Sequence, residues 1–579
     1  MLQWQKLLPF LRWIPELKKS GVLQADIIAG VTVALILIPQ SMAYAQLANL
    51  PAYYGLYAAF LPVLIAALFG SSNQLMTGPV AVVSLLTASS LGSLAVAGSE
   101  QFIAYAILLS FLVGTFQLML GVFRLGVVLN FLSHPVIVGF TNAAALIIAF
   151  SQFYKLFGVN KPETGAFITD VLDVVSQIGD THFHSLAMAV TAIAIMVSVK
   201  KLWPKIPGVL FAVVITTVAS YLFNFEQSGG VVVGSIPAGL PTIQLPVFDF
   251  DVLHELIISA IVISLIGFME AISIAKAMAA RTKQRIDVNQ ELIGQGLANL
   301  VGSFSLSYPT SGSFSRSAVN LNAGAITGFS SVVTAAVVLV TLLFLTPLLY
   351  HLPAAVLASV IMMAVMGLVN FKAIKHAWRA HKHDGFAAGV TFVGTLGFAP
   401  HLEWGIVIGA SLALGLYLFR TMRPRVAILG RYKDGTLRDI AIHPELATDK
   451  RLVAVRFDGS LYFANVSYFE DAILAAEANN PKAKFILVVG DAINQLDASG
   501  EEVLRHIVER MKETGVTLVF SGLKRQIILV LKHTGAWEVI GDENIFATED
   551  MALKSIYQRL SEDSSDDEPR PLEPLPTPI

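Results

Sequence analysis

The sequence predicts a polytopic α-helical membrane protein whose chain ends in a soluble α/β domain. Of its 579 residues, 55% are hydrophobic and only 14% are charged, whereas soluble proteins usually carry about 25% charged residues. Long apolar stretches follow one another up to about residue 425. Beyond that point, short apolar runs alternate with amphipathic helical patterns, which is typical of a folded α/β domain.

Fourteen apolar segments are predicted to span the membrane, because most of them are long enough to cross a hydrocarbon core of roughly 30 Å. Lys and Arg cluster after the even-numbered segments, which indicates that these ends and both chain termini are cytoplasmic. A cytoplasmic N-terminal segment, 1–25, precedes the first span. The predicted spans are 27–47, 52–70, 78–96, 102–122, 130–153, 183–200, 207–224, 253–279, 288–305, 313–323, 326–347, 353–370, 385–399 and 403–420.

The transmembrane domain, 26–425, is predicted to consist of two repeats of seven spans, about 26–224 and 251–425. An odd number of spans gives the two halves opposite orientations. The third span of each half follows a polar, non-helical stretch, 72–79 and 307–313. Interrupted spans at matching places in inverted halves indicate the midplane site of a transporter. We therefore expect two short helices that meet at their N-termini; the alternative is a pair of proline-kinked helices without a ligand.

The second interrupted span gives the clearer signal for a bound anion. Pro309 and Gly312 disfavour a helix before Ser313, which is a good N-cap for the helix that follows. The unpaired N–H groups and the positive dipole end of such a helix attract negative charge. The candidate anion-binding residues in this span are Ser313, Phe314, Ser315 and Arg316.

Glu270, well inside the eighth span, is the candidate proton-coupling residue. A charged carboxylate at the bilayer centre costs about 2.5–3.5 kcal/mol on insertion scales, so such residues are usually functional. Two helix N-termini contribute roughly half a positive charge each, and with Arg316 they approach the charge of a dianion. Protonation of Glu270 would then favour anion binding. In a second interpretation, Arg316 only neutralises Glu270, and both interpretations stay open.

The first span contributes Gln40 and Tyr44, which lie one turn apart next to Pro39. Both side chains can donate hydrogen bonds to an oxyanion, although a Tyr near the end of a span is also a common interfacial anchor. No catalytic constellation, nucleotide-binding fingerprint or basic block for nucleic acid is present. The sequence therefore predicts no enzyme activity, no cofactor and no metal site; the run 381–384 is interpreted as a solvated turn.

The C-terminal domain is predicted to span 430–560. Buried strands are expected at 452–457, 485–489 and 516–520, separated by helices near 466–478, 499–513 and 523–533. The last stretch, 561–579, mixes acidic residues with prolines and is expected to be disordered.

Five stretches resemble the sulfate permease (SulP) family of anion transporters, and the resemblance covers essentially the whole chain. The hydroxyl-rich stretch before Arg316 and the Glu at 270 are most similar to plant-type proton-coupled sulfate transporters. The C-terminal part resembles the STAS domain (sulfate transporter and anti-sigma factor antagonist), with 497–500 at its strand-to-helix signature. The five stretches are 38–45, 54–57, 77–81, 289–296 and 308–320.

The resemblance implies a core domain and a gate domain, elevator-like alternating access and a homodimer. Sodium-coupled members carry Thr where Ile274 stands, which argues against a sodium site. The regulatory serine of the anti-sigma factor antagonists would fall at Ser499, for which a helix N-cap is the alternative interpretation. The resemblance also places the anion between the third and tenth spans, with contacts from the first, at Gln40, Tyr44, Val80, Ala81 and Ser315.

We therefore expect a sulfate:proton symporter in a bacterial-type inner membrane, with the proton as coupling ion and a cytoplasmic protein partner for the STAS domain. A bicarbonate or dicarboxylate symporter of the same fold is the alternative within transport. An uncoupled, channel-like anion conductor and a regulatory scaffold with a membrane anchor are alternatives of other classes. Glu270 argues against the conductor, because a conductor does not need a costly buried carboxylate.

Overall fold

The computed structural model describes residues 8–127, 133–160, 167–203, 207–562 and 569–573. The chain divides into two units, Met1–Ala413 and Leu414–Ile579. The division falls inside helix α18 (Leu402–Met422), close to the predicted change of composition near residue 425. Each unit has hydrophobic clusters of its own.

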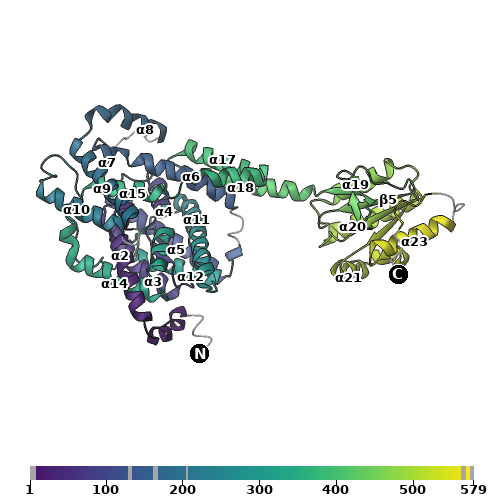
Figure 1. Ribbon diagram of the computed structural model, residues 1–579, viewed down its shortest axis with the longest axis horizontal. Helices are drawn as coiled ribbons and strands as arrows, with labels where there is room; N and C mark the ends of the chain where they lie inside the picture. The colour runs from purple at the N-terminus through teal and green to yellow at the C-terminus, as the bar shows by residue number, and fades with distance from the viewer. Residues whose placement is uncertain (1–7, 128–132, 161–166, 204–206, 563–568, 574–579) are drawn as a thin grey trace. The chain divides into compact units, whose positions relative to one another are not determined.

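The first unit is mainly helical (Figure 1) and contains two very short strands within the described ranges. A helix lies at each of the fourteen predicted segments, and within the described ranges seven helices are long and apolar enough to cross a membrane. The number of spans and the inverted repeat remain predictions. The helices at these segments are α2 (Val22–Leu47), α3 (Tyr53–Phe69), α4 (Ala81–Leu91), α5 (Glu100–Val122), α6 (His134–Ser151), α9 (Phe183–Leu202), α10 (Gly208–Leu222), α11 (Phe250–Thr282), α12 (Val288–Ser303), α13 (Phe314–Asn322), α14 (Phe329–Val340), α15 (Ala354–Val365), α17 (Lys382–Phe398) and α18.

Several helices of this unit were not predicted. The helix α16 (Phe371–Ala380) lies between the predicted spans 353–370 and 385–399, and it contains no buried residue. Its apolar side chains Phe371 and Trp378 are exposed and lie seven residues apart, hence on one face. The other additions include α7 (Phe153–Phe157), α8 (Phe167–Ser176) and the 3₁₀ helix Gln177–Asp180. The 3₁₀ helices Pro9–Arg12 and Ile14–Lys18 lie in the stretch 4–19, for which the sequence predicts a short amphipathic cytosolic helix.

The two strands of the first unit form a small buried sheet. Strand β1 (Met76–Gly78) pairs antiparallel with β2 (Ser311–Ser313), so that Met76 lies opposite Ser313 and Gly78 lies opposite Ser311. Helix α4 begins three residues after β1, and α13 begins directly after β2. The sheet therefore brings the two predicted interrupted spans together.

The second unit is a six-stranded sheet with helices on both faces (Figure 1). Successive residues of β5 point to opposite faces: Val453 and Val455 pack with α19, α20 and α21, whereas Leu452 and Ala454 pack with α23. The strand order is β4-β3-β5-β6-β7-β8. The elements are β3 (Val426–Arg431), β4 (Leu437–Asp439), β5 (Leu452–Phe457), α19 (Val466–Ala478), β6 (Phe485–Val489), α20 (Ala498–Glu513), β7 (Thr517–Ser521), α21 (Arg525–Thr534), α22 (Ala536–Ile540), β8 (Ile545–Phe546) and α23 (Glu549–Glu562).

Two predictions for this unit are wrong in part. Ser499 is not an N-cap: Asp497 caps α20, and its Oδ1 accepts a hydrogen bond from Gly500 N at 2.8 Å. Asp competes well for this position because its short carboxylate reaches the free N–H groups. The tail is not disordered throughout, since α23 extends to Glu562 and the Leu572 side chain is buried among residues of α23 and the sheet. Its other residues, 563–568 and 574–579, lie outside the described part.

Candidate functional site

The candidate site lies at the starts of α4 and α13. Because β1 and β2 are antiparallel, the helices that follow them leave the sheet in opposite directions while beginning close together. The N-cap of α4 is Val80, which has no side-chain oxygen to cap the first N–H groups. The N-cap of α13 is Ser313, as predicted, and its Oγ accepts from Arg316 N at 3.5 Å. Two positive helix ends therefore share one small volume.

Arg316 places a full positive charge in the same volume. Its side chain is completely buried. The guanidinium Nη2 donates to Pro79 O at 2.8 Å, directly before the start of α4, and Nη1 lies 3.5 Å from Gln40 Oε1 on α2. Nε is buried without a hydrogen-bond partner among the described residues. Buried cations are normally paired with an anion, so this geometry suits a negatively charged ligand.

The other predicted contact residues are near this cation but differ in exposure. Gln40 and Tyr44 are buried on α2, which runs through Pro39 as one continuous helix. Tyr44 is close enough to interact electrostatically with both Arg316 and Glu270. Val80 and Ala81 are buried at the start of α4, whereas Ser315 and Phe314 are exposed, with 59% of Phe314 accessible. The residues at the start of α13 are thus more exposed than those at the start of α4.

Glu270 lies on the turn of α11 that packs against β2. Ser311 Oγ donates to Gly267 O at 2.5 Å, and a methyl group added to Gly312 would lie 3.0 Å from Ala271 Cα. The Glu270 side chain is half-buried. Within the described ranges Glu270 forms no hydrogen bond and no ion pair, and Arg316 forms no ion pair either. The interpretation in which Arg316 neutralises Glu270 therefore has no ion pair to support it.

The sequence analysis missed three buried polar residues around the site. Tyr308 is fully buried and its hydroxyl lies 3.3 Å from Ser84 Oγ on α4. On α12, Gln295 hydrogen-bonds to Thr77 inside β1, and Asn299 hydrogen-bonds to Thr310, directly before β2. The available signal was the spacing of four between Glu291, Gln295 and Asn299 within a predicted span, which places all three on one helix face.

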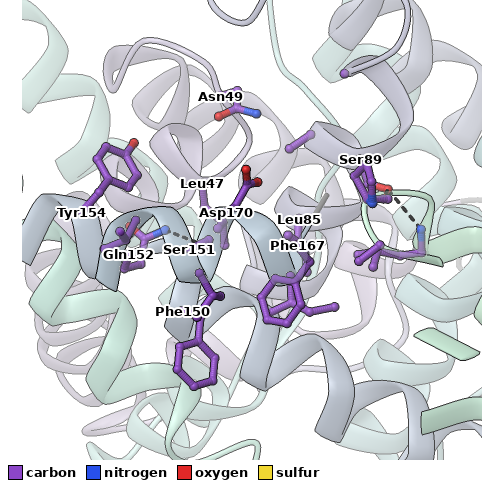
Figure 2. Close-up of a pocket in the computed structure, with 18 of the residues that line it drawn as sticks. Leu47, Asn49, Leu85, Ser89, Phe150, Ser151, Gln152, Tyr154, Phe167 and Asp170 are labelled. Atoms are coloured by element: carbon purple, nitrogen blue, oxygen red, sulfur yellow. Dashed lines mark hydrogen bonds between the residues drawn. The ribbon is translucent and has the colours of Figure 1, made fainter. Parts of the chain in front are cut away.

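A separate cavity of about 450 Å³ lies at the other end of α4 (Figure 2). Its lining includes Leu85 and Ser89 of α4, Leu47 at the end of α2, and residues of α6 to α8 such as Phe150 and Asp170. None of the predicted site residues lines it. The cavity and the candidate anion site therefore occupy opposite ends of the same short helix.

The fold and the site together define a multi-pass membrane protein in which two interrupted helices surround a buried cation. Residues 23–391 match the model of the sulfate permease family, and residues 443–552 match the model of the STAS domain. The chain belongs to the sulfate permease family and carries a C-terminal STAS domain. Its family is one of transporters, not of enzymes.

Curated relatives and a solved structure agree with this assignment. The chain is 33% identical to "Sulfate transporter 4.1, chloroplastic" of Arabidopsis thaliana, over 98% of this chain and 85% of the relative. It is 32% identical to "High affinity sulfate transporter 1" of Stylosanthes hamata, over 94% of this chain and 85% of the relative. The structure of the murine Solute Carrier 26 family member A9 anion transporter in the inward-facing state superposes with a TM-score of 0.89 at 24% identity, over 96% of this chain and 95% of that chain. This last likeness shows the fold.

Proposed function

We propose that the protein is a secondary-active transporter that carries sulfate together with a proton. The observation that carries the proposal is Arg316 at the starts of α4 and α13, which is completely buried and has no ion-pair partner within the described ranges. A tetrahedral dianion fits this charge, because two helix ends of roughly half a charge each and one guanidinium sum to about two positive charges. The printed names of the relatives, which are sulfate transporters, support sulfate as the anion.

The anion would accept hydrogen bonds from the N–H groups at the starts of α4 and α13, near Val80, Ala81 and Phe314. Further hydrogen bonds to the anion would come from Gln40, Tyr44 and the Ser315 hydroxyl, since each can donate one. Glu270 stands next to β2 without a partner in the described part of the chain. An ionised Glu270 would oppose anion binding and a protonated Glu270 would permit it. Binding of the proton would therefore favour binding of the anion, and binding of the anion would favour binding of the proton.

Proteoliposomes that contain the full-length protein test proton coupling. We expect sulfate uptake to rise as the outside pH falls, and an inward proton gradient to drive accumulation without sodium. Glu270→Gln should abolish pH-driven accumulation, because the amide takes up no proton. Glu255→Gln is the matched control, since Glu255 lies on the same helix with half of its side chain exposed. Full pH-driven accumulation by Glu270→Gln would refute the coupling role, and wild-type uptake that does not depend on pH would favour an uncoupled conductor.

We further propose a homodimer that works by an elevator-like movement in the cell inner membrane, with both termini in the cytoplasm. The clusters of Lys and Arg after the even-numbered predicted spans support this orientation. Because the chain has no cysteine, single cysteines introduced at Lys201 and Gly98 can be labelled without background. Labelling of the first from the cytoplasm and of the second from outside is expected; the reverse pattern would overturn the orientation. The mass of the detergent-solubilised protein tests the dimer.

A further inference from the structure

A row of polar side chains runs along one face of α12. Glu291, Gln295 and Asn299 follow one another at a spacing of four, so they lie above one another on the helix. All three are essentially inaccessible, with at most 1% of each residue exposed. Three buried polar groups are costly in a membrane helix unless they are hydrogen-bonded. Their partners therefore indicate why α12 carries them.

The first two residues of the row hold the segment that leads into β1. Glu291 Oε2 accepts hydrogen bonds from Ser71 N at 2.8 Å and from Ser72 N at 2.9 Å. Gln295 Nε2 donates to Thr77 Oγ1, in the middle of β1, at 2.7 Å. Thr77 precedes Val80, the N-cap of α4, by three residues. Gln295 thus positions the start of α4.

The third residue holds the segment that leads into β2. Asn299 Oδ1 accepts from Thr310 N at 2.7 Å and from Thr310 Oγ1 at 3.0 Å, and Asn299 Nδ2 donates to Thr310 O at 3.1 Å. The Asn299 amide therefore pairs with both backbone polar groups of Thr310, as a neighbouring strand would. Thr310 precedes Ser313, the N-cap of α13, by three residues. The two attachments are equivalent in the two interrupted spans.

Helix α12 is itself held tightly in the helix bundle. A methyl group added to Gly114 of α5 would lie 2.3 Å from Leu300 N of α12, and one added to Gly296 would lie 2.5 Å from Leu118 N of α5. Small residues allow two helix backbones to approach this closely, so α12 packs directly against α5. The two attachment points lie on the same helix, one helical turn or about 6 Å apart along α12, and their separation is therefore fixed.

We propose that Gln295 and Asn299 set the separation of the two helix starts and thereby the size of the anion that the site accepts. They are positioning residues, because they act through Thr77 and Thr310 and do not touch the anion. The inference rests on the proposed function and adds a specificity determinant to it. If the N–H donors at the starts of α4 and α13 are held at a fixed separation, the site discriminates against larger anions. If one of the two helix starts can move, the site accepts larger anions as well.

Competitive uptake of tetrahedral dianions of increasing size, sulfate, selenate and molybdate, into proteoliposomes tests the proposal with the full-length protein. Gln295→Met removes the donor at similar volume, and Thr77→Val removes the acceptor. Loss of one hydrogen bond corresponds to roughly a tenfold change. Each variant should therefore raise the sulfate KM about tenfold and lower the preference for sulfate over molybdate to a similar extent. The double variant should be no worse than the worse single variant, because both delete the same bond.

Two controls separate positioning from general loss of structure. Thr77→Ser keeps the accepting oxygen and should retain the wild-type preference. Thr87→Val removes a buried hydroxyl of α4 whose one hydrogen bond within the described ranges is to Val83 O of its own helix, and should leave the preference unchanged. A purely structural role would lower Vmax without altering the ratio between the anions.

If Thr77→Val and Gln295→Met both leave the uptake ratios of the three anions unchanged, the inference is wrong, whereas the proposed function is unaffected. If Gln295→Met does not fold, Thr77→Val decides the outcome. A wild-type protein that takes up none of the three anions would overturn the proposed function, and the inference with it.

Discussion

Arg316 has the surroundings of a ligand-binding side chain. Its charge is completely buried, its two assigned partners are the neutral oxygens Pro79 O and Gln40 Oε1, and Nε has no partner in the described part of the chain. Arginine suits this place because its planar guanidinium donates in several fixed directions at once. The same side chain can thus hydrogen-bond to Pro79 O before the start of α4 and still donate a hydrogen bond to an anion.

Replacement of Arg316 should weaken anion binding strongly. A hydrogen bond to a charged group is worth about 1.5–3 kcal/mol, so we expect Arg316→Gln to raise the sulfate KM by roughly tenfold to a hundredfold. Arg316→Lys should fall between this variant and the wild type, because it keeps the charge but not the fork of donors. Initial uptake rates over a range of sulfate concentrations measure the effect. A wild-type KM in Arg316→Gln would exclude a role in binding.

At the scale of single elements, α20 of the STAS domain shows how local chemistry decides a helix start. Both Asp497 and Ser499 are residues that favour an N-cap. Asp497 takes the position, and its second carboxylate oxygen accepts from Phe463 N at 2.9 Å, which ties the helix to a neighbouring loop. Ser499 lies inside the first turn, partly exposed. The regulatory role of Ser499 stays a prediction.

The two residues should therefore respond differently to substitution. Asp497→Ala should destabilise α20 by about 1 kcal/mol, the usual cost of a lost N-cap, whereas Ser499→Ala should stay within about 0.5 kcal/mol of the wild type. Hydrogen exchange of the 498–513 segment in the full-length protein measures both. An equal effect of the two substitutions would contradict the assignment of the cap.

At the scale of the whole molecule, each unit buries its own core. The first unit is organised around helices of the membrane region, and the second around the two faces of its sheet. Leu572 belongs to the second unit, although it lies in an acidic and proline-rich stretch. Its backbone N also donates to the Tyr557 hydroxyl at 3.0 Å. This short segment thus helps α23 to cover one face of the sheet.

Leu572→Ala should destabilise the second unit only. Buried Leu→Ala substitutions cost about 2–5 kcal/mol, and a site near the end of the chain should be at the low end of this range. In urea, hydrogen exchange should show earlier loss of protection in β5, β6 and β7, with no change in α5 and α12. Equal loss of protection in both units would show that their stabilities are coupled.

The positions of the helices at the fourteen predicted segments and of β5, β6 and β7 could be predicted from the sequence alone, because apolar length and periodicity report directly on burial. The sequence also predicted the Ser313 N-cap, the isolated acid at Glu270 and the two interrupted spans. Each of them is a polar or helix-breaking feature within an otherwise apolar segment. Amphipathic α16 was missed because its charges resemble those of a loop.

Only the tertiary structure decided which residues meet. Three contacts join positions more than two hundred residues apart: the pairing of β1 with β2, the Arg316 bond to Pro79 O and the Gln295 bond to Thr77. The bond between Asn299 and Thr310 joins α12 to the segment before β2. A local pattern records whether a residue is buried, but a hydrogen bond depends on where two segments pack. For this protein, composition and periodicity determined the membrane helices and the α/β domain, and packing around α12 decided the geometry of the candidate anion site.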